Sequence, residues 1–296
     1  MSIDSSQLAT FAAVVNEGTF EAAARTLHVT PSAVSQRIKA LERAVGQVLV
    51  RRTKPCRATD AGQPLLRLAG QVALLETEAV NASRGGIGSG QVRTRVAVVV
   101  NADSLATWFL PALAGMASSA VSFDLREEDE GHTAELLRDG TVMAAVTAEN
   151  VAVQGCRIER LGAMRYVAAA SPALADRVFP QGPTAAALAA APMIVFNRKD
   201  RLQHRFVRSV TRRRLDPPIH YVPSAAAFIE AIRLGLGWGM VQEQIAVDEL
   251  AAGRCVRLDE HRHLDVPLYW QHWRLDSAVL DALTASVTAA AAASLR

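Results

Sequence analysis

The 296-residue chain has few cysteines, few aromatic residues and no long apolar run. Its three cysteines, Cys56, Cys156 and Cys255, are odd in number and far apart, and no C-x-x-C pair occurs. This spacing excludes a disulfide scaffold and a zinc ribbon, and it fits a reducing compartment. The longest apolar run, 185–196, is interrupted by Pro192 and is too short to cross a bilayer.

Signals for export, catalysis and metal binding are also missing. The N-terminus, MSIDSSQLAT, has no basic region before an apolar stretch. No G-x-S-x-G, Walker loop or G-x-G-x-x-G is present, and the glycines of 235–239 lack the preceding strand and the spacing of a nucleotide loop. His261, His263 and His272 do not have the spacing of a metal-ligating pair. We therefore expect a soluble cytoplasmic protein that is not an enzyme and that holds no metal or cofactor.

The position of the charge is more informative than its total. The formal net charge is +3, and residues 1–90 hold the whole excess. Within 25–57, eight Lys and Arg residues stand against one acid, Glu42. A local excess of this size can neutralise several DNA phosphates. The alternative is a solvated basic surface, and charge alone does not decide between the two.

Apolar residues recur at the i, i+3, i+4 and i+7 spacing of amphipathic helices in the first 45 residues. Gly18 ends the first predicted helix, Thr19 can cap the second, and Thr30-Pro31 is a strong start for the third. Two short helices with a brief turn between them predict a helix-turn-helix whose later helix enters the major groove. The apolar positions are Leu8, Phe11, Ala12 and Val15; Phe20, Ala23, Ala24 and Leu27; and Val34, Ile38 and Leu41.

A hairpin is predicted to follow these helices. The segments 48–50 and 57–58 flank a turn at Lys54-Pro55, which predicts a basic wing that holds phosphates without reading sequence. Ser32 and Gln36 can reach base edges, although Ser32 and Ser35 could also be ordinary helix-start residues. The candidate DNA-binding residues are Thr30, Pro31, Ser32, Ser35, Gln36, Arg37, Lys39, Arg51, Arg52 and Lys54.

The next segment predicts one long helix and a hinge. The helix runs from a cap at Thr59 to about residue 82, and the glycine-rich stretch 85–90 marks the domain boundary. Apolar residues alternate by three and four along the helix, which favours pairing with a second copy of the chain. The alternative is packing against its own domain. The candidate dimerisation residues are Leu65, Leu68, Val72, Leu75 and Ala79.

Strands and helices alternate beyond the hinge, which predicts an α/β fold with a mostly parallel sheet. Ligands of such sheets bind beyond the carboxyl ends of strands, often against helix N-termini. The candidate ligand-binding positions after strands are Asn101, Asp103, Ser104, Ser224, Glu128 and Asp129. Ser104 and Ser224 could instead only cap their helices, and the acidic run at 127–130 could be a solvated surface. The expected strands are 95–100, 121–125, 143–147, 166–170, 193–196, 219–222 and 239–241, and the expected helices include 105–116, 133–138 and 225–234.

The N-terminal motifs resemble a known family. Residues 11–62 are similar to the DNA-binding domain of LysR-type transcriptional regulators in the alanine-rich second helix, in TPSAVSQRIKALE and in the step Gly46, Leu49, Arg52. Val50 stands where the family usually has phenylalanine. Residues 91–296 resemble the LysR effector domain, with two lobes like those of periplasmic binding proteins. NADSLATWFLPAL, EDEGHT, GLGWGM and DVPLYWQHWRLDS are similar to the LysG/ArgP subgroup, although Gln242 stands where proline is expected.

The resemblance implies three parts. The first is an all-α winged helix-turn-helix over 1–60, and the second is a linker and dimerisation helix with a hinge over 61–90. The third is an effector-binding domain over 91–296, with lobe I at about 91–162 and 268–296 and lobe II at about 163–267.

The resemblance also implies a function. It predicts a homodimeric or homotetrameric activator that binds double-stranded DNA, senses L-lysine or L-arginine and controls a basic-amino-acid exporter gene, with RNA polymerase as a candidate partner. The effector's carboxylate would lie at Ser104 and Ser224 and its cation near Glu128 or Asp129, with Thr147 and Glu149 as further lining candidates. The alternatives are an architectural, origin-binding DNA protein without an effector response, and a C-terminal enzyme or solute-binding module.

Arg212, Arg213 and Arg214 form a second basic feature. We interpret this run as a solvated loop rather than as a further DNA contact, because a short charge run is usually a solvated surface.

Overall fold

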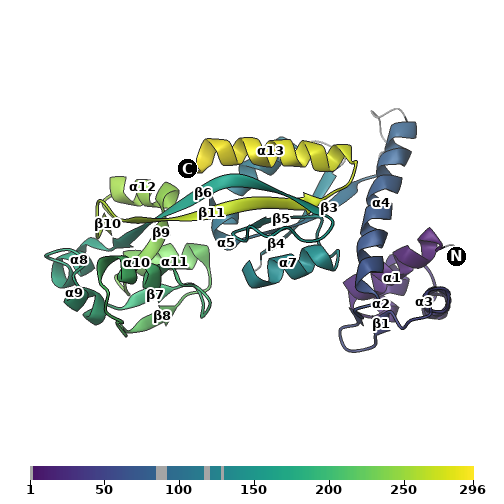
Figure 1. The fold of residues 1–296 in the computed structure, drawn as a ribbon, viewed down its shortest axis with the longest axis horizontal. Coiled ribbons are helices and arrows are strands. Elements are labelled where there is room, and N and C mark those ends of the chain that lie inside the picture. Colours follow the sequence, from purple (N-terminus) through teal and green to yellow (C-terminus); the bar gives the residue numbers. More distant parts are fainter. Residues whose placement is uncertain (1–2, 85–91, 117–120, 128–129) are drawn as a thin grey trace. The chain divides into compact units, whose positions relative to one another are not determined.

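The computed structural model describes residues 3–84, 92–116, 121–127 and 130–296 (Figure 1). The predicted hinge, 85–90, and the candidate residues Glu128 and Asp129 lie outside the described residues. The chain divides into two compact units. Unit 1 is Met1–Val100, Leu113–Glu159 and Trp270–Ser286, and unit 2 is Asn101–Ala112, Arg160–Tyr269 and Val287–Arg296.

Three capped helices open unit 1, as predicted. The side chains of Asp4, Thr19 and Thr30 each accept a hydrogen bond from a backbone N–H in the first turn of the helix that follows. Such caps satisfy donors that have no partner inside the helix. The helices are α1 (Ser5–Glu17), α2 (Phe20–Thr26) and α3 (Pro31–Val45).

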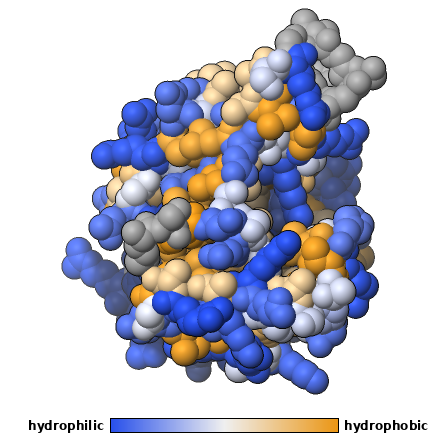
Figure 2. Space-filling view, turned by 90° about the vertical axis from the view of Figure 1, so that its right-hand side faces the viewer, coloured by the Kyte–Doolittle hydropathy of each residue, from blue (hydrophilic) through white to orange (hydrophobic). Residues whose placement is uncertain are grey.

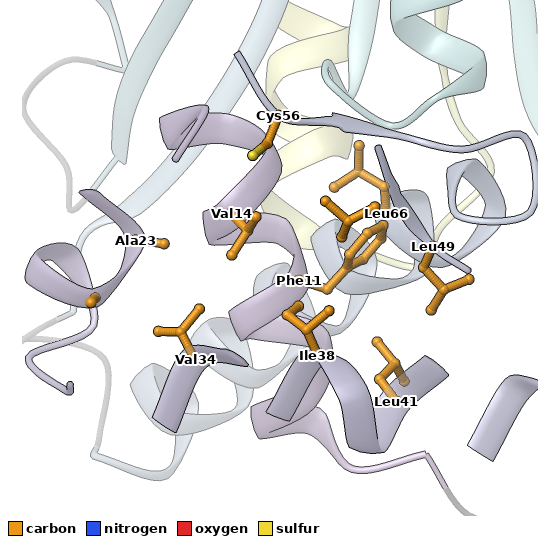
Figure 3. Packing of buried hydrophobic residues seen from close by; sticks show 11 residues of the cluster. Phe11, Val14, Ala23, Val34, Ile38, Leu41, Leu49, Cys56 and Leu66 are labelled. Atoms are coloured by element: carbon orange, nitrogen blue, oxygen red, sulfur yellow. The ribbon is translucent and has the colours of Figure 1, made fainter. Parts of the chain in front are cut away.

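The predicted apolar stripes meet in one core (Figure 3). Phe11 of α1 is fully buried and packs with Val34, Ile38 and Leu41 of α3, and α4 adds Leu66. Burying each large apolar side chain contributes roughly 1.5–3 kcal/mol. This core holds α3 against α1 and leaves the opposite face of α3 free for contacts.

The wing is a short hairpin tied to the helices at both ends. Strand β1 (Val50–Arg51) pairs antiparallel with β2 (Arg57–Ala58). The Glu42 carboxylate accepts the N–H of Leu49 at 2.9 Å and that of Val50 at 3.4 Å. At the tip, the N–H of Cys56 donates to the carbonyl oxygen of Gly18 at 2.7 Å. The predicted hairpin is therefore confirmed; its second strand has the expected bounds, and its first strand is one residue shorter than expected and ends one residue later.

The long helix α4 (Gln63–Ser83) begins later than predicted. Thr59 is not its cap; the hydroxyl of Thr59 accepts the N–H of Gly62 and donates to the carbonyl oxygen of Val48. These bonds close the turn that precedes α4, which is why the helix cannot begin at Thr59. One face of α4 is buried in unit 1 through Leu66, Ala69 and Leu74.

In unit 1, α4 also contacts the first part of the C-terminal region. The Arg67 guanidinium donates to the carbonyl oxygens of Arg138 and Gln154, and the Glu78 carboxylate accepts from the Ser277 hydroxyl at 2.7 Å. Strand β3 (Thr94–Val100) lies between β4 (Val121–Glu127) and β5 (Ala144–Thr147) and is parallel to both. Helix α7 (Glu130–Arg138) completes this α/β arrangement as expected.

Unit 2 is built around residues 160–170 of the long strand β6. This strand is Cys156–Ala170 and thus begins ten residues before the expected start. Its C-terminal residues, 166–170, pair antiparallel with β9 (Gly239–Gln242) and with β10 (Val256–Arg257). The expected mostly parallel sheet is therefore wrong here, because alternation along the chain does not determine which strands pair or in which direction. Strands β7 (Met193–Val195) and β8 (Ile219–Tyr221) are parallel, as expected.

The remaining elements complete the two units. The expected helix 105–116 is divided into a π-helical turn, η1 (Leu105–Phe109), and α6 (Leu110–Ala114), and the short helix α5 (Ala102–Ser104) precedes it. Strand β11 (His263–Trp273) and helix α13 (Ala278–Ser294) each contribute to both units. The other helices are α8 (Pro172–Val178), α9 (Ala185–Ala190), α10 (Leu202–Val210), α11 (Ala225–Arg233) and α12 (Glu243–Ala251). Within the described ranges, no helix has both the length and the apolar character that a membrane crossing requires.

A buried carboxylate connects α11 and α12 in unit 2. The Glu249 side chain is only 5% exposed and accepts hydrogen bonds from the guanidinium groups of Arg254 and Arg233. These bonds lower the pKa of Glu249 to about 2. Because the folded-state pKa lies below the usual value, the pairing stabilises the fold above about pH 4.5 and this stabilisation is lost as the pH falls toward 2.

We expect Gly62→Ala to destabilise the N-terminal domain by about 1–3 kcal/mol. A Cβ at this position would lie 2.5 Å from the Leu49 carbonyl oxygen and 3.0 Å from the Phe11 ring. Far-UV circular dichroism should detect the loss, because the affected domain is mostly helical. The control is Gly115→Ala, where a Cβ would meet nothing within 4 Å. Equal unfolding curves for both variants would contradict the steric argument.

We expect Glu249→Gln to lower the stability of unit 2 at pH 7 by about 1–3 kcal/mol, because two guanidinium groups lose a charged acceptor. The free energy of unfolding, followed by tryptophan fluorescence, should also depend less on pH between about pH 5 and pH 2. Glu230→Gln is the matched control, because Glu230 binds the same Arg233 but is 51% exposed. Unfolding of Glu249→Gln with the acid dependence of the original protein would contradict the assigned role.

Candidate DNA-binding surface and effector pocket

Helix α3 presents a polar face away from the core. Pro31, Ser32, Gln36 and Lys39 are exposed, and Ser35 is half-buried beside them. Thr30 caps the helix through its side chain, which accepts the N–H of Ala33 at 3.2 Å. Short and flexible hydrogen-bonding side chains on an exposed helix can reach base edges in the major groove.

Arg37 lies apart from this face. Its side chain is half-buried, and it donates to the Thr10 hydroxyl of α1 at 3.4 Å. Arg37 therefore helps to hold α3 against α1, whereas the neighbouring Gln36 points outward. A position within residues 25–57 was not sufficient to distinguish these two roles, because consecutive residues of a helix face different directions.

The wing cations are accessible. Arg51, Arg52 and Lys54 are all exposed. The Arg52 guanidinium lies 4.8 Å from the ring centroid of Phe20, a cation–π distance that orients the side chain, and Arg51 makes only an exposed ion pair with Asp60 at 3.5 Å. Hydrophilic side chains predominate on the face drawn in Figure 2, with smaller hydrophobic patches between them. The arrangement is suited to phosphate contacts beside a base-reading helix.

In unit 2, the segment that begins at Asn101 places polar atoms in a buried environment. Ser104 is fully buried, and its hydroxyl has no hydrogen-bond partner among the described residues; the same holds for the Asn101 side-chain oxygen. Ser104 therefore does not cap a helix. The following π-helical turn η1 also places the Trp108 Nε1 without a partner in the described residues. π-Helical turns and unsatisfied buried polar atoms both occur preferentially at functional sites.

Asp103 lines a pocket in the same unit. Its carboxylate accepts a 2.5 Å hydrogen bond from the hydroxyl of Tyr166, a buried residue of β6. The pocket has an empty volume of about 370 Å³, open solvent included. This volume is at the lower end of the range for small-molecule sites, which begins at about 300 Å³. The described lining residues are Asp103, Phe196, Asp200, Leu202, Gln203, Ala225, Phe228, Ile229, Met240, Val241 and Gln242.

The chemistry of the lining is acidic and amide-rich. Two carboxylates, Asp103 and Asp200, contribute to it, and no basic side chain is among the described lining residues. Gln203 is 1% exposed, and its Oε1 atom lacks a partner in the described residues. Gln242, at the position where proline was expected, adds a second amide. Such a lining can accept a small ligand that carries a cation and hydrogen-bonding groups.

The other predicted ligand-binding residues lie at separate places. Ser224 caps α11 by accepting the N–H of Ala227 at 3.4 Å and directly precedes Ala225 of the pocket. Thr147 and Glu149 belong to unit 1, where the Thr147 hydroxyl accepts the Glu149 N–H at 3.1 Å. Thr147 is buried and Glu149 is exposed.

Sequence reasoning missed most of the pocket. Asp200, Gln203 and Gln242 lie on three segments whose proximity depends on how β9 and α10 pack, and no spacing in the chain indicates it. Of these three residues, only Gln242 was singled out by the sequence, because it stands where proline was expected. Within the described ranges, no group of three His, Cys, Asp or Glu side chains could hold a metal ion. Each cysteine is free and buried.

Comparison with known proteins identifies both regions. Residues 5–63 match the family of bacterial regulatory helix-turn-helix proteins, lysR family, and residues 89–292 match the LysR substrate binding domain. The HTH-type transcriptional regulator LysG of Mycobacterium tuberculosis is 54% identical over 98% of this chain and 94% of its own length. The lysine export transcriptional regulatory protein LysG of Corynebacterium glutamicum is 43% identical, with 98% of each chain covered.

Solved structures agree over the full length. The crystal structure of ArgP from M. tuberculosis has a TM-score of 0.89 and 52% identity, and it covers 100% of this chain and 99% of that one. Full-length LysG from C. glutamicum, solved with the bound effector Arg, has a TM-score of 0.80 and 42% identity, with 99% of each chain covered. The predicted fold class and the predicted resemblance are confirmed: the chain belongs to the LysR family of bacterial regulatory helix-turn-helix proteins.

Proposed function

We propose that this protein is a DNA-binding transcriptional regulator that senses a basic amino acid and controls the gene of a basic-amino-acid exporter. The acidic pocket of unit 2 is the observation that carries the effector assignment. Relatives named for lysine export, and a full-length relative solved with arginine bound, support the same class of ligand. DNA in the cytoplasm is the corresponding partner of the N-terminal domain.

Electrostatics favour lysine or arginine over a neutral amino acid. The side-chain cation of either ligand would be stabilised by Asp103, whose carboxylate is held in place by Tyr166. The ligand carboxylate needs donors, which the Gln203 and Gln242 amides and the hydroxyls of Ser104 and Ser224 could supply. Thr147 and Glu149, and Glu128 and Asp129 beyond the described residues, remain candidate contributors to effector binding.

We propose self-association through α4. Leu68 is 37% exposed and Leu75 is 38% exposed, Ala79 is exposed, and Val72 is half-buried. Leu65 is half-buried and packs in part against the N-terminal core. The face that carries these five residues thus differs from the buried face of α4, which favours pairing with a second copy. A dimer would present two α3 helices to successive turns of the major groove.

Regulation then follows from linkage between the two sites. A ligand shifts an equilibrium only if it binds one assembly state more tightly than the other. The effector must therefore have different affinities for the free and the DNA-bound protein, and DNA must change the effector affinity by the same factor. The architectural alternative, without an effector response, has no support from the comparisons, and relatives of this chain are regulators rather than enzymes.

We expect Gln36→Ala to reduce the preference for the operator over other sequences, because Gln36 is the exposed amide of α3. Arg52→Ala should instead weaken binding to all sequences and reduce the slope of log K against log salt by about one unit. Fluorescence anisotropy with operator and scrambled duplexes measures both effects. Arg177→Ala, an exposed arginine of α8, is the control. Undiminished sequence discrimination by Gln36→Ala would remove this residue from base readout.

We expect Asp103→Asn to weaken lysine or arginine binding at least about tenfold, because one charged hydrogen-bond acceptor is worth about 1.5–3 kcal/mol. Isothermal titration calorimetry of the full-length protein measures the affinity, with leucine as the neutral ligand. Asp216→Asn removes an exposed carboxylate of the same unit and should have no effect. If neither basic amino acid binds the original protein, the effector assignment is wrong; if Asp103→Asn binds normally, only the role of Asp103 is wrong.

A further inference from the structure

Unit 2 carries a basic segment, residues 198–214, that effector binding does not explain. It contains eight basic residues and one acid within 17 positions, the same excess as the 33-residue segment 25–57 of the DNA-binding domain. Because the whole chain has a formal charge of only +3, the rest of the protein is net negative. All eight basic side chains are exposed: Arg198, Lys199, Arg201, Arg205, Arg208, Arg212, Arg213 and Arg214.

Helix α10 orders the centre of the basic segment. Its inner face is buried through Gln203, Phe206 and Val207. The helical period of 3.6 residues therefore places Arg205 and Arg208, with Arg201 at the N-cap, on the outer side. The three arginines form a row along one helix, and the arginines of 212–214 follow directly after it.

The single acid of the basic segment is occupied by the backbone. The Asp200 carboxylate accepts the N–H of Phe196 at 3.1 Å and that of Leu202 at 2.9 Å, and it lines the effector pocket. It makes no ion pair with an arginine of the segment among the described residues. The acid thus shapes the start of α10 rather than covering the positive surface.

The remaining arginines of unit 2 show a different pattern. Six of the eight arginines of unit 2 outside the basic segment form an ion pair with an Asp or Glu, whereas Arg160 and Arg177 have none in the described part of the chain; the six are Arg165, Arg233, Arg254, Arg257, Arg262 and Arg296. None of the seven arginines in the basic segment has such a pair within the described part of the chain. Arg198 lies 5.1 Å from the ring centroid of Tyr221, which leaves its charge in place. The positive charge of these seven arginines therefore has no acidic partner within the described residues.

The arginines on and beside α10 also affect the pKa of His204. Its pKa is lowered, first by burial and then by the positive charges of Arg201 and Arg208, with Asp200 acting in the opposite direction. The cations of α10 thus act together on a neighbouring group.

We propose that the basic segment is a second DNA-contacting surface, which binds the phosphate backbone of double-stranded DNA without reading its sequence. The run 212–214, which the sequence alone favoured as a solvated loop, belongs to this surface because it continues the exposed arginines of α10. This inference rests on the proposed function, because the N-terminal domain brings the DNA near the rest of the chain and so raises its effective concentration. Seven of the eight cations are arginines, whose planar guanidinium groups bind phosphate in a bidentate manner.

The composition favours DNA over an acidic protein as the partner. Protein interfaces usually have an apolar centre depleted of charge. Here Phe206 and Val207 of α10 are buried, its Leu202 and Val210 are half-buried, and the exposed positions are mostly cationic. A surface of charge alone is typical of phosphate contacts, which position a protein on DNA and carry no sequence information.

The test compares full-length variants by the salt dependence of binding to a long duplex. Each phosphate contact contributes about 0.9 to the slope of log K against log salt. We expect the triple variant Arg201→Gln, Arg205→Gln, Arg208→Gln to reduce the slope by about 2–3 units for each protomer that is engaged. The matched control, Arg157→Gln, Arg160→Gln, Arg177→Gln, removes the same charge from exposed arginines outside the basic segment and should leave the slope unchanged.

A second variant and a further ligand make the result decisive. Arg212→Gln, Arg213→Gln, Arg214→Gln lies outside any helix or strand, so it tests the same surface with little risk to folding, and its slope should also fall. Equal slopes for the control and both segment variants would overturn the inference. If both segment variants keep the DNA slope of the original protein but lose binding to polyglutamate, the partner is an acidic protein and the inference is wrong.

A variant of the wing distinguishes failure of this inference from failure of the proposed function. The variant Arg51→Gln, Arg52→Gln, Lys54→Gln should weaken binding through the N-terminal domain. If it does so while the segment variants behave like the control, the DNA-binding function holds and the second surface is excluded. If the original protein binds no duplex at low salt, both the proposed function and the inference are wrong.

Discussion

The hydrogen bonds between the Glu42 carboxylate and the N–H groups of Leu49 and Val50 hold the wing of the DNA-binding domain against helix α3. They fix the wing to the recognition helix α3, so both elements can meet one duplex as a rigid pair. Glu42 is also the only acid between residues 25 and 57. Because this acid is bonded to the backbone, the outer surface of the domain presents mainly positive charge.

The same use of an acid recurs in unit 2 at Asp200, which bonds to the backbone at the start of α10 while the arginines around it point outward. Glu249 differs, because it is bonded to two arginine side chains rather than to the backbone and stabilises the fold. Asp103 represents a third case, a carboxylate held by a tyrosine hydroxyl at the edge of a pocket. The surroundings of each carboxylate, rather than its residue type, decide whether it shapes the backbone, supports the fold or serves a ligand.

Much of the fold could be predicted, and the errors have specific physical causes. Helical periodicity and caps predicted α1, α2 and α3 because both signals are local. The start of α4 was wrong because Thr59 forms hydrogen bonds with the preceding hairpin, a contact between separate parts of the chain. The antiparallel partners of β6 were missed because strand order along the chain does not determine pairing.

By itself, the sequence determined the helix-turn-helix, the basic wing, the amphipathic long helix and the LysR family, since periodicity, caps and motifs are properties of neighbouring residues. Tertiary structure decided that Arg37 packs inward while Gln36 points outward. It also decided that Asp103, Gln203 and Gln242 share one pocket, and that the arginines of α10 have no ion pair among the described residues whereas Arg165 and Arg233 do. The reason is that burial and charge pairing depend on contacts between segments far apart in the chain, which only the packed fold brings together.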